Sequence, residues 1–323
     1  MLSRVADNLY WMSRYLERAE HTMRVVDVNM TLSLEPSMVF PSQRLFRVLA
    51  SLSLPISRTN VTDFSSLTEL LTLDRENPSS IISCITNARE NARQVREQIS
   101  QEMWEHLNRI YLQIQEATPQ IVWLERPYNF FRAIKEAAQL FQGITDSTMS
   151  HAEGRHFILL GRYLERANAT CALLQTHFSP FLDFQETHPG AKDYSEWVGP
   201  LKSCAAFESY CKVCSPYLEP VPIVEFLLLN KDFPRSVRFA LDRVGHSLDA
   251  IAMAAGKANN DRLTKIVGEF QSQLDGVRTQ EILQSGFRSF LGTLRQGCSE
   301  IHDLLHNACI AYPIETAALL GAS

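Results

Sequence analysis

The stretch Arg14-Tyr-Leu-Glu-Arg-Ala19 occurs a second time, residue for residue, as Arg162-Tyr-Leu-Glu-Arg-Ala167. The copies start at positions 14 and 162, which lie 148 residues apart in a chain of 323. Each copy sits inside a pattern of apolar residues spaced by three and four, the periodicity of an α-helix. We therefore expect two long helices that carry the same charged motif.

The first of these helices is predicted over residues 2–31. Its apolar residues form a single seam: Leu2, Val5, Leu9, Met12, Leu16, Ala19, Met23, Val26 and Met30. The second helix is predicted over 149–178 and differs, because apolar residues surround its charged motif on both faces. A helix that is apolar all round is normally buried. The second copy of the motif is therefore expected in or beside the core.

The rest of the chain shows helical periodicity as well, and no strand-like alternation extends over a comparable length. The predicted segments are 42–53, 63–73, 79–117, 128–143, 195–215, 220–230, 234–256, 259–275 and 279–311. The clearest irregular stretch is 179–200, where prolines and glycines cluster. We predict an all-α fold, built as a helical bundle.

A second pair of matches indicates an internal duplication. The stretch 71–81 aligns with 227–237 and keeps both leucines, the proline and a serine. We predict two diverged, pseudo-symmetric helical repeats, 1–148 and 149–323, that form one integrated domain. Pro78 and Pro234 are each expected in the first turn of a helix, where the missing N–H costs nothing. Asn77 is the expected cap of the first helix, and Asp232 of the second.

The charged residues of the two motifs allow three interpretations. Glu17 and Glu165 could pair with arginines of their own or the other copy and hold two buried helices in register. Alternatively, the arginines could bind a carboxylate or phosphate in a groove between the copies, with the glutamates orienting them or contacting an amine. A solvated charged face is the third interpretation. The candidate ligand-binding residues are Arg14, Glu17, Arg18, Arg162, Glu165 and Arg166, and Glu17 and Glu165 are the candidate catalytic residues.

Arg89 and Arg93 lie in a second polar cluster on a predicted helix. Glutamates at three- and four-residue spacings make a surface ladder of ion pairs one explanation. The other explanation joins Arg89 and Arg93 to the motif arginines as an anion-binding surface. In that case Arg235 and Arg238 are the counterparts in the second copy.

Composition excludes several function classes. The formal net charge is −5 and the basic residues are dispersed, which argues against a nucleic-acid partner. The N-terminal stretch is interrupted by charges, and no apolar run has the length of a membrane span. We therefore expect a cytoplasmic protein with no membrane partner. The seven cysteines are scattered, as reduced thiols are, and ordinary packing is favoured for Cys211 and Cys214.

Metal and cofactor signals are weak. His302 and His306 share a helix face, and Glu17 with His21 forms another carboxylate–imidazole pair. Neither pair repeats in the other copy, and the spacing of a di-iron bundle is missing, so no metal site is expected. The chain also lacks a glycine-rich phosphate loop, a nucleophile elbow and a kinase signature. We expect no cofactor and no ATP-dependent chemistry within this chain.

Three further stretches carry a resemblance to a known family. The segments "NLYWMSRYLERAEHTMRVVD", "NARENARQVREQISQEMWEHLN" and "FLLLNKDFPRSVRFALDRV" resemble the alpha-E family, a bacterial all-helical family named for its Glu-Arg motif. The resemblance spans nearly the whole chain, and the matching motif residues are Glu17-Arg18 and Glu165-Arg166. It implies an association with circularly permuted ATP-grasp ligase-like proteins and transglutaminase-like peptidases, and a role in making or modifying a peptide.

This chain has no ATP-grasp or peptidase portion, so a ligase would be a separate polypeptide. We expect an accessory or scaffold component of such a peptide system, which binds a partner or an anionic peptide-like ligand. The alternative is an enzyme of that system that uses Glu17 and Glu165 with the neighbouring arginines. A pocket that exposes either glutamate would favour the enzyme, and solid packing around both would favour the scaffold.

Overall fold

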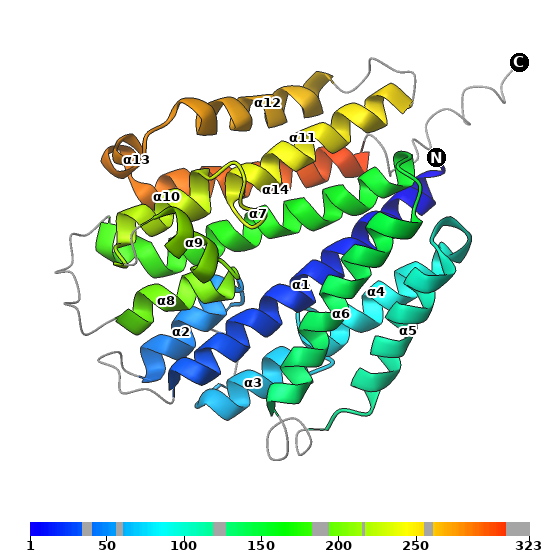
Figure 1. The fold of residues 1–323 in the computed structure, drawn as a ribbon, viewed down its shortest axis with the longest axis horizontal. Helices are drawn as coiled ribbons and strands as arrows, with labels where there is room; N and C mark the ends of the chain where they lie inside the picture. Colours follow the sequence, from blue (N-terminus) through cyan, green and yellow to red (C-terminus); the bar gives the residue numbers. More distant parts are fainter. Residues whose placement is uncertain are drawn as a thin grey trace, which may run out of the picture.

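The chain folds into an all-α bundle (Figure 1). The computed structural model describes residues 1–33, 41–55, 61–118, 127–182, 194–214, 217–254 and 261–307, and within these ranges it has helices and no β-strand. The first half holds α1 (Ser3–Ser33), α2 (Pro41–Ser51), α3 (Phe64–Thr72), α4 (Ile81–Gln94), a 3-10 helix (Arg96–Gln98), α5 (Gln101–Gln115) and α6 (Pro127–Thr148). The second half holds α7 (Glu153–Leu182), α8 (Tyr194–Ser203), α9 (Phe207–Val213), α10 (Pro220–Leu229), α11 (Val237–Ala254), α12 (Asp261–Gly276), α13 (Thr279–Ser285) and α14 (Phe287–Leu305).

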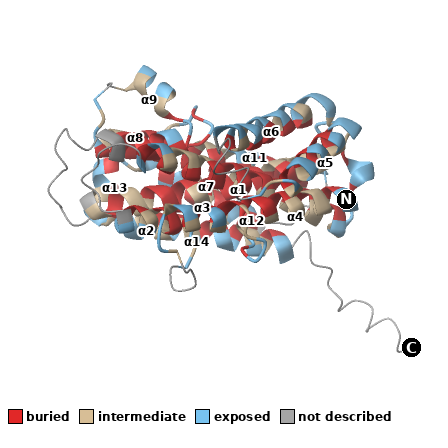
Figure 2. Cartoon of the chain, turned by 90° about the horizontal axis from the view of Figure 1, so that it is seen from below, coloured by how far each residue is buried: buried red, intermediate tan, exposed pale blue. Residues whose placement is uncertain are grey.

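The two motif helices, α1 and α7, run side by side through the centre of the molecule (Figure 1). Helices α4 and α6 pack on α1, and α11 and α14 pack on α7. Buried residues concentrate along this central pair, while the outer helices expose one face (Figure 2). The burial predicted for the second motif helix is therefore observed, and α1 is buried in the same way.

Gly161 allows α1 and α7 to approach closely. A Cβ atom at this position would lie 2.2 Å from the backbone oxygen of Tyr10, a distance that no side chain can occupy. Tyr10 itself is fully buried, as is the small side chain of Ser13 on the next turn of α1. Gly161 thus lets the two charged motifs come within hydrogen-bonding reach of each other.

The two halves place their helices in the same packing order. In the first half α1 contacts α4, α4 contacts α5, α5 contacts α6, and α6 returns to α1. The second half repeats this cycle with α7, α11, α12 and α14. Ser53 and Ala205, each two residues after the end of α2 or α8, both have a left-handed backbone, with φ of 58° and 49°. These correspondences are those expected of two repeats, and the pseudo-symmetry and the division at residues 148 and 149 stay predictions.

Three predicted helices are each divided in two. The segment 79–117 is interrupted between α4 and α5, where the hydroxyl of Ser100 accepts a hydrogen bond from the Met103 N–H and caps α5. The segment 195–215 is interrupted at Ala205, and 279–311 at Gly286, whose φ is 98°. The end of the last segment lies outside the described residues.

The predicted starts of α4 and α11 were also wrong. Pro78 and Pro234 precede the helices instead of lying in their first turns. The caps are Ser80 and Ser236, whose hydroxyl oxygens accept hydrogen bonds from the N–H groups of Ser83 and Phe239. Asn77 and Asp232 are not the caps, because a serine adjacent to the helix reaches the first-turn N–H groups more directly.

Candidate functional site

The two Glu-Arg motifs bind each other reciprocally. Arg166 donates from Nε to Oε1 of Glu17 (2.8 Å) and from Nη2 to Oε2 (2.7 Å). Arg18 donates in the same bidentate manner to Glu165, at 2.6 and 3.1 Å. Planar pairs of this kind are strong and fix the relative orientation of their helices. Each glutamate therefore pairs with the arginine of the other copy, one of the arrangements that the sequence left open.

Glu17 belongs to a larger set of charges, which we call the closed network: Glu17, Glu20, Arg24, Arg166 and Arg235. Arg235 donates to Oε1 of Glu17 (3.0 Å) and to Oε1 of Glu20 (2.6 Å). Arg24 adds two further hydrogen bonds to Glu20. Burial alone would raise the pKa of Glu17, but Arg166 and Arg235 hold it well below its ordinary value. Glu17 is 2% exposed and stays ionised, with no access for a substrate.

Glu165 belongs to the second set, the open network: Arg14, Arg18 and Glu165. Arg14 donates from Nε to Oε2 of Glu165 (2.8 Å) and from Nη1 to the hydroxyl oxygen of Tyr10 (3.1 Å). Its guanidinium also stacks on Trp11. Burial would raise the pKa of Glu165, but Arg14 and Arg18 outweigh it and lower the pKa to about 2.

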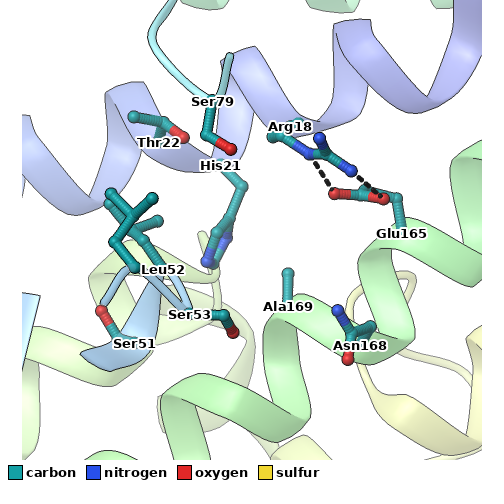
Figure 3. A pocket seen from close by; sticks show the side chains of 11 residues that line it. Arg18, His21, Thr22, Ser51, Leu52, Ser53, Ser79, Glu165, Asn168 and Ala169 are labelled. Atoms are coloured by element: carbon teal, nitrogen blue, oxygen red, sulfur yellow. Dashed lines mark hydrogen bonds and ion pairs between the residues drawn. The ribbon is translucent and has the colours of Figure 1, made fainter. Parts of the chain in front are cut away.

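A pocket of about 230 Å³ lies against the open network. We call it the Arg18 pocket, and Figure 3 shows its lining seen from close by. The central helices provide Arg18, His21, Thr22, Glu165 and Asn168. Ser51 at the end of α2 and residues of two loops provide the other polar groups. Ser53 comes from the turn after α2, and Ser79 from the loop before α4.

His21 is the least satisfied polar group of the Arg18 pocket. The residue is 6% exposed, and its Nε2 atom has no hydrogen-bond partner among the described residues. In Figure 3 its ring reaches into the space between α1, α7 and the turn after α2. Burial, with Arg235 nearby, lowers the pKa of His21 to about 4, so the imidazole is neutral at pH 7. A buried nitrogen without a partner is costly unless a ligand or water supplies one.

The charge of the Arg18 pocket favours an anion. Two arginines, Arg14 and Arg18, face the single carboxylate of Glu165. Nη1 of Arg18 has no recorded hydrogen bond within the described part of the chain. Neutral His21, Ser79 and Asn168 add groups that can donate to an incoming oxygen.

Several predicted site residues lie elsewhere. Arg89 donates to Asn108 and stacks on Trp104 and Tyr111, and Arg93 pairs with Glu90 on the surface. Neither lines the Arg18 pocket, so the structure does not bring them together with Arg18 there, and an anion-binding surface that joins them to the motif arginines stays a prediction. The two residues proposed as their counterparts in the second copy have different partners. Arg235 belongs to the closed network, whereas Arg238 pairs with Asp242 and Asp275.

Arg162 and the pair His302 and His306 also do not line the Arg18 pocket. Arg162 is buried, burial lowers its pKa, and no carboxylate of the described residues lies within ion-pair distance. Nδ1 of His302 is hydrogen-bonded to the hydroxyl of Tyr10 at 2.9 Å. Within the described ranges, no group of three or more His, Cys, Asp or Glu side chains is placed to hold a metal ion. In the same ranges, no helix combines the length and apolarity of a membrane span.

Sequence reasoning missed Ser53, Ser79, Asn168 and Glu20. Taken singly these are ordinary polar residues, and only the internal repeat could have marked them. Asn168 stands where the first copy has Glu20, and Ser79 stands where the second copy has Arg235. The differences between the copies identify the residues that distinguish the open network from the closed one.

Comparison with known proteins places the chain among helical proteins with the same motif. The family model Alpha-E, "a predicted alpha-helical domain with a conserved ER motif", matches residues 1–308. Uncharacterized proteins of Mycobacterium bovis and Mycobacterium tuberculosis are 22% identical over 338 residues, an alignment that covers 96% of this chain. The chain spans 37% of the length of these relatives. No solved structure matches significantly.

Proposed function

The chain belongs to the Alpha-E family, and we propose that it is a binding component, and not the catalyst, of a peptide-ligating or peptide-modifying system. Its ligand is anionic and peptide-like, and a carboxylate group of that ligand occupies the Arg18 pocket. The observation that carries this proposal is the neutral, buried His21 beside an arginine pair that outnumbers its carboxylate.

Catalysis by the motif glutamates is the weaker alternative. A general acid or base needs a pKa near the working pH and a path for its proton. Glu165 lines the Arg18 pocket, which is the feature that favours an enzyme, but its pKa is about 2. Glu17 is enclosed by arginines that hold its pKa well below its ordinary value. Both carboxylates therefore remain ionised and engaged at neutral pH. They suit the work of holding α1 and α7 and orienting Arg18.

The partners in this proposal come from the family resemblance. A separate ATP-grasp ligase-like protein would carry out the ATP-dependent step, with a transglutaminase-like peptidase as a further partner, in the cytoplasm. Co-purification of tagged protein from its host, followed by mass spectrometry, tests this part. Recovery of such a ligase supports the accessory role, and robust ATP turnover by the purified chain alone would overturn it.

The binding function is tested with N-acetylglycine and N-acetylglycinamide, which differ in the carboxylate. Calorimetry is expected to show saturable binding of the acid and at least tenfold weaker binding of the amide. Arg18→Gln should weaken binding of the acid by at least tenfold because it removes the charge that meets the carboxylate. Arg93→Gln is the matched control, since Arg93 is 52% exposed and pairs outside the pocket. Equal binding of acid and amide would refute the proposal.

A further inference from the structure

The Arg18 pocket has a counterpart in the second half of the chain, and there an arginine fills it. Ser79 and Arg235 occupy equivalent positions in the paired stretches 71–81 and 227–237. Both residues directly precede the serine that caps the next helix, Ser80 before α4 and Ser236 before α11. The two side chains therefore leave the backbone at equivalent places.

The walls that receive these side chains correspond as well. Arg235 extends to Glu17 and Glu20 on α1, and its guanidinium bonds to both carboxylates. The equivalent positions on α7 are Glu165 and Asn168, which line the Arg18 pocket. Because Ser79 is short, the path that Arg235 occupies in one half is open in the other.

Two differences between the halves reverse the charge preference of the open half. Asn168 stands in place of the carboxylate of Glu20. Arg14 pairs with Glu165, whereas its counterpart Arg162 forms no ion pair with Glu17 among the described residues. In the closed half, two carboxylates bind the incoming arginine. The equivalent site in the open half thus has excess positive charge. An incoming group on the Arg235 path would meet Arg18 and the free nitrogen of His21, which suits a carboxylate.

A groove of about 390 Å³ with an acidic rim adjoins the Arg18 pocket at Leu54, which lines both. The groove is lined further by Pro55, Leu70, Asp74 and Glu76. One carboxylate oxygen of Asp74 accepts from the Glu76 N–H, and the structure records no ion pair for either residue within its described ranges. The groove therefore presents apolar side chains followed by two carboxylates free to meet a positive charge.

We propose that this groove binds the C-terminal segment of a peptide that carries a basic side chain next to its terminal carboxylate. The inference rests on the proposed binding function, and the terminal carboxylate is the anionic group of that function. The terminal carboxylate occupies the Arg18 pocket along the path that Arg235 takes in the second half. The preceding residues lie over Leu54 and Leu70, and a lysine or arginine side chain of the peptide meets Asp74 and Glu76.

Three tripeptides test this assignment by calorimetry: N-acetyl-Ala-Lys-Ala as the free acid, its C-terminal amide, and N-acetyl-Ala-Glu-Ala as the free acid. We expect the lysine acid to bind at least tenfold more tightly than either of the others. The double variant Asp74→Asn, Glu76→Gln should lose the preference for lysine over glutamate and keep the preference for acid over amide.

Filling the path tests the route. Ser79→Arg places in the open half the side chain that the closed half carries, and it should weaken binding of the lysine acid by at least tenfold. Ser299→Arg, at an exposed position on α14, is the control and should bind normally. Ser79→Gln fills the path more gently and gives the same test if the arginine variant does not fold.

The outcomes separate this inference from the proposed function. Equal affinity for the lysine and glutamate acids overturns the basic-peptide assignment and leaves carboxylate binding intact. Equal affinity for acid and amide overturns both. Undiminished binding by folded Ser79→Arg and Ser79→Gln overturns the route through the Arg235 path.

Discussion

Replacing Glu17 by glutamine should strongly destabilise the fold. Glu17 accepts three hydrogen bonds, two from Arg166 and one from Arg235, in a site where all three side chains are largely buried. Glutamine keeps the shape but leaves Arg166 without its carboxylate partner and Arg235 with Glu20 alone. Removing one partner of a buried ion pair costs about 3 to 5 kcal/mol. At ~2.1 cal/mol/K of unfolding entropy per residue, this lowers the melting midpoint by about 4 to 7 °C.

The matched control is Glu90→Gln. Glu90 also accepts from an arginine, which in this case lies on the same helix. Its side chain is 46% exposed, and exposed pairs contribute less than about 1 kcal/mol. Calorimetric melts of both variants and the parent give the comparison. Arg166→Gln combined with Glu17→Gln should cost less than the sum of the single changes, because the two groups share one network. Equal midpoints for the Glu17 and Glu90 variants would refute the buried network as a stabilising element.

Three further predictions concern pH and packing. Glu165 has a pKa of about 2 in the folded chain and 4.5 ordinarily, so its stabilisation is present above pH ~4.5 and is lost as pH falls towards 2, by about 3 kcal/mol in denaturant titrations. Glu165→Gln should abolish that part of the pH dependence, and an unchanged acid profile would contradict it. His21, with a pKa of about 4 against 6.5, contributes stability above pH ~6.5 that is lost towards pH 4, so His21→Gln should flatten the profile in that window; a slope as steep as the parent's would count against a buried neutral imidazole. Gly161→Ala should destabilise the fold by about 1 to 3 kcal/mol, because the added Cβ collides with the Tyr10 backbone. Gly143→Ala, with open space around it on α6, should stabilise the fold by about 0.5 to 1 kcal/mol. Equal melting midpoints for the two variants would contradict the close crossing of α1 and α7.

The sequence predicted the helices, and it offered pairing between the two motifs as one of three interpretations, because both follow from local patterns. Apolar residues around Glu165 indicated burial of α7, and identical motifs indicated equivalent positions. The burial of Glu17 was harder to predict, since the second buried face of α1 consists largely of polar residues such as Glu20 and His21. A polar face of this kind is typical of a solvent-exposed helix surface, and the sequence does not show the residues on other helices that bury it.

The pocket and the helix breaks depend on contacts that periodicity does not carry. Ser79 lines the pocket because its side chain is too short to fill the space. This role becomes clear only when Ser79 is compared with Arg235, the equivalent residue of the second half. Gly286 is a readable helix break, whereas the end of α4 at Gln94 has neither glycine nor proline to mark it. Val95 and Ile99, which follow, are buried in the core, and the periodicity does not show where the chain turns to bury them.

The most direct test of carboxylate binding in the Arg18 pocket is the side-chain NMR signal of His21 during titration with N-acetylglycine. His106, a buried histidine on α5 whose Nε2 is hydrogen-bonded to the backbone oxygen of Ala137, serves as the reference in the same spectra. Binding in the pocket predicts that the ring nitrogen signals of His21 shift saturably while those of His106 stay in place. Calorimetric binding with unchanged His21 signals would contradict the account, because the ligand would then occupy another part of the molecule.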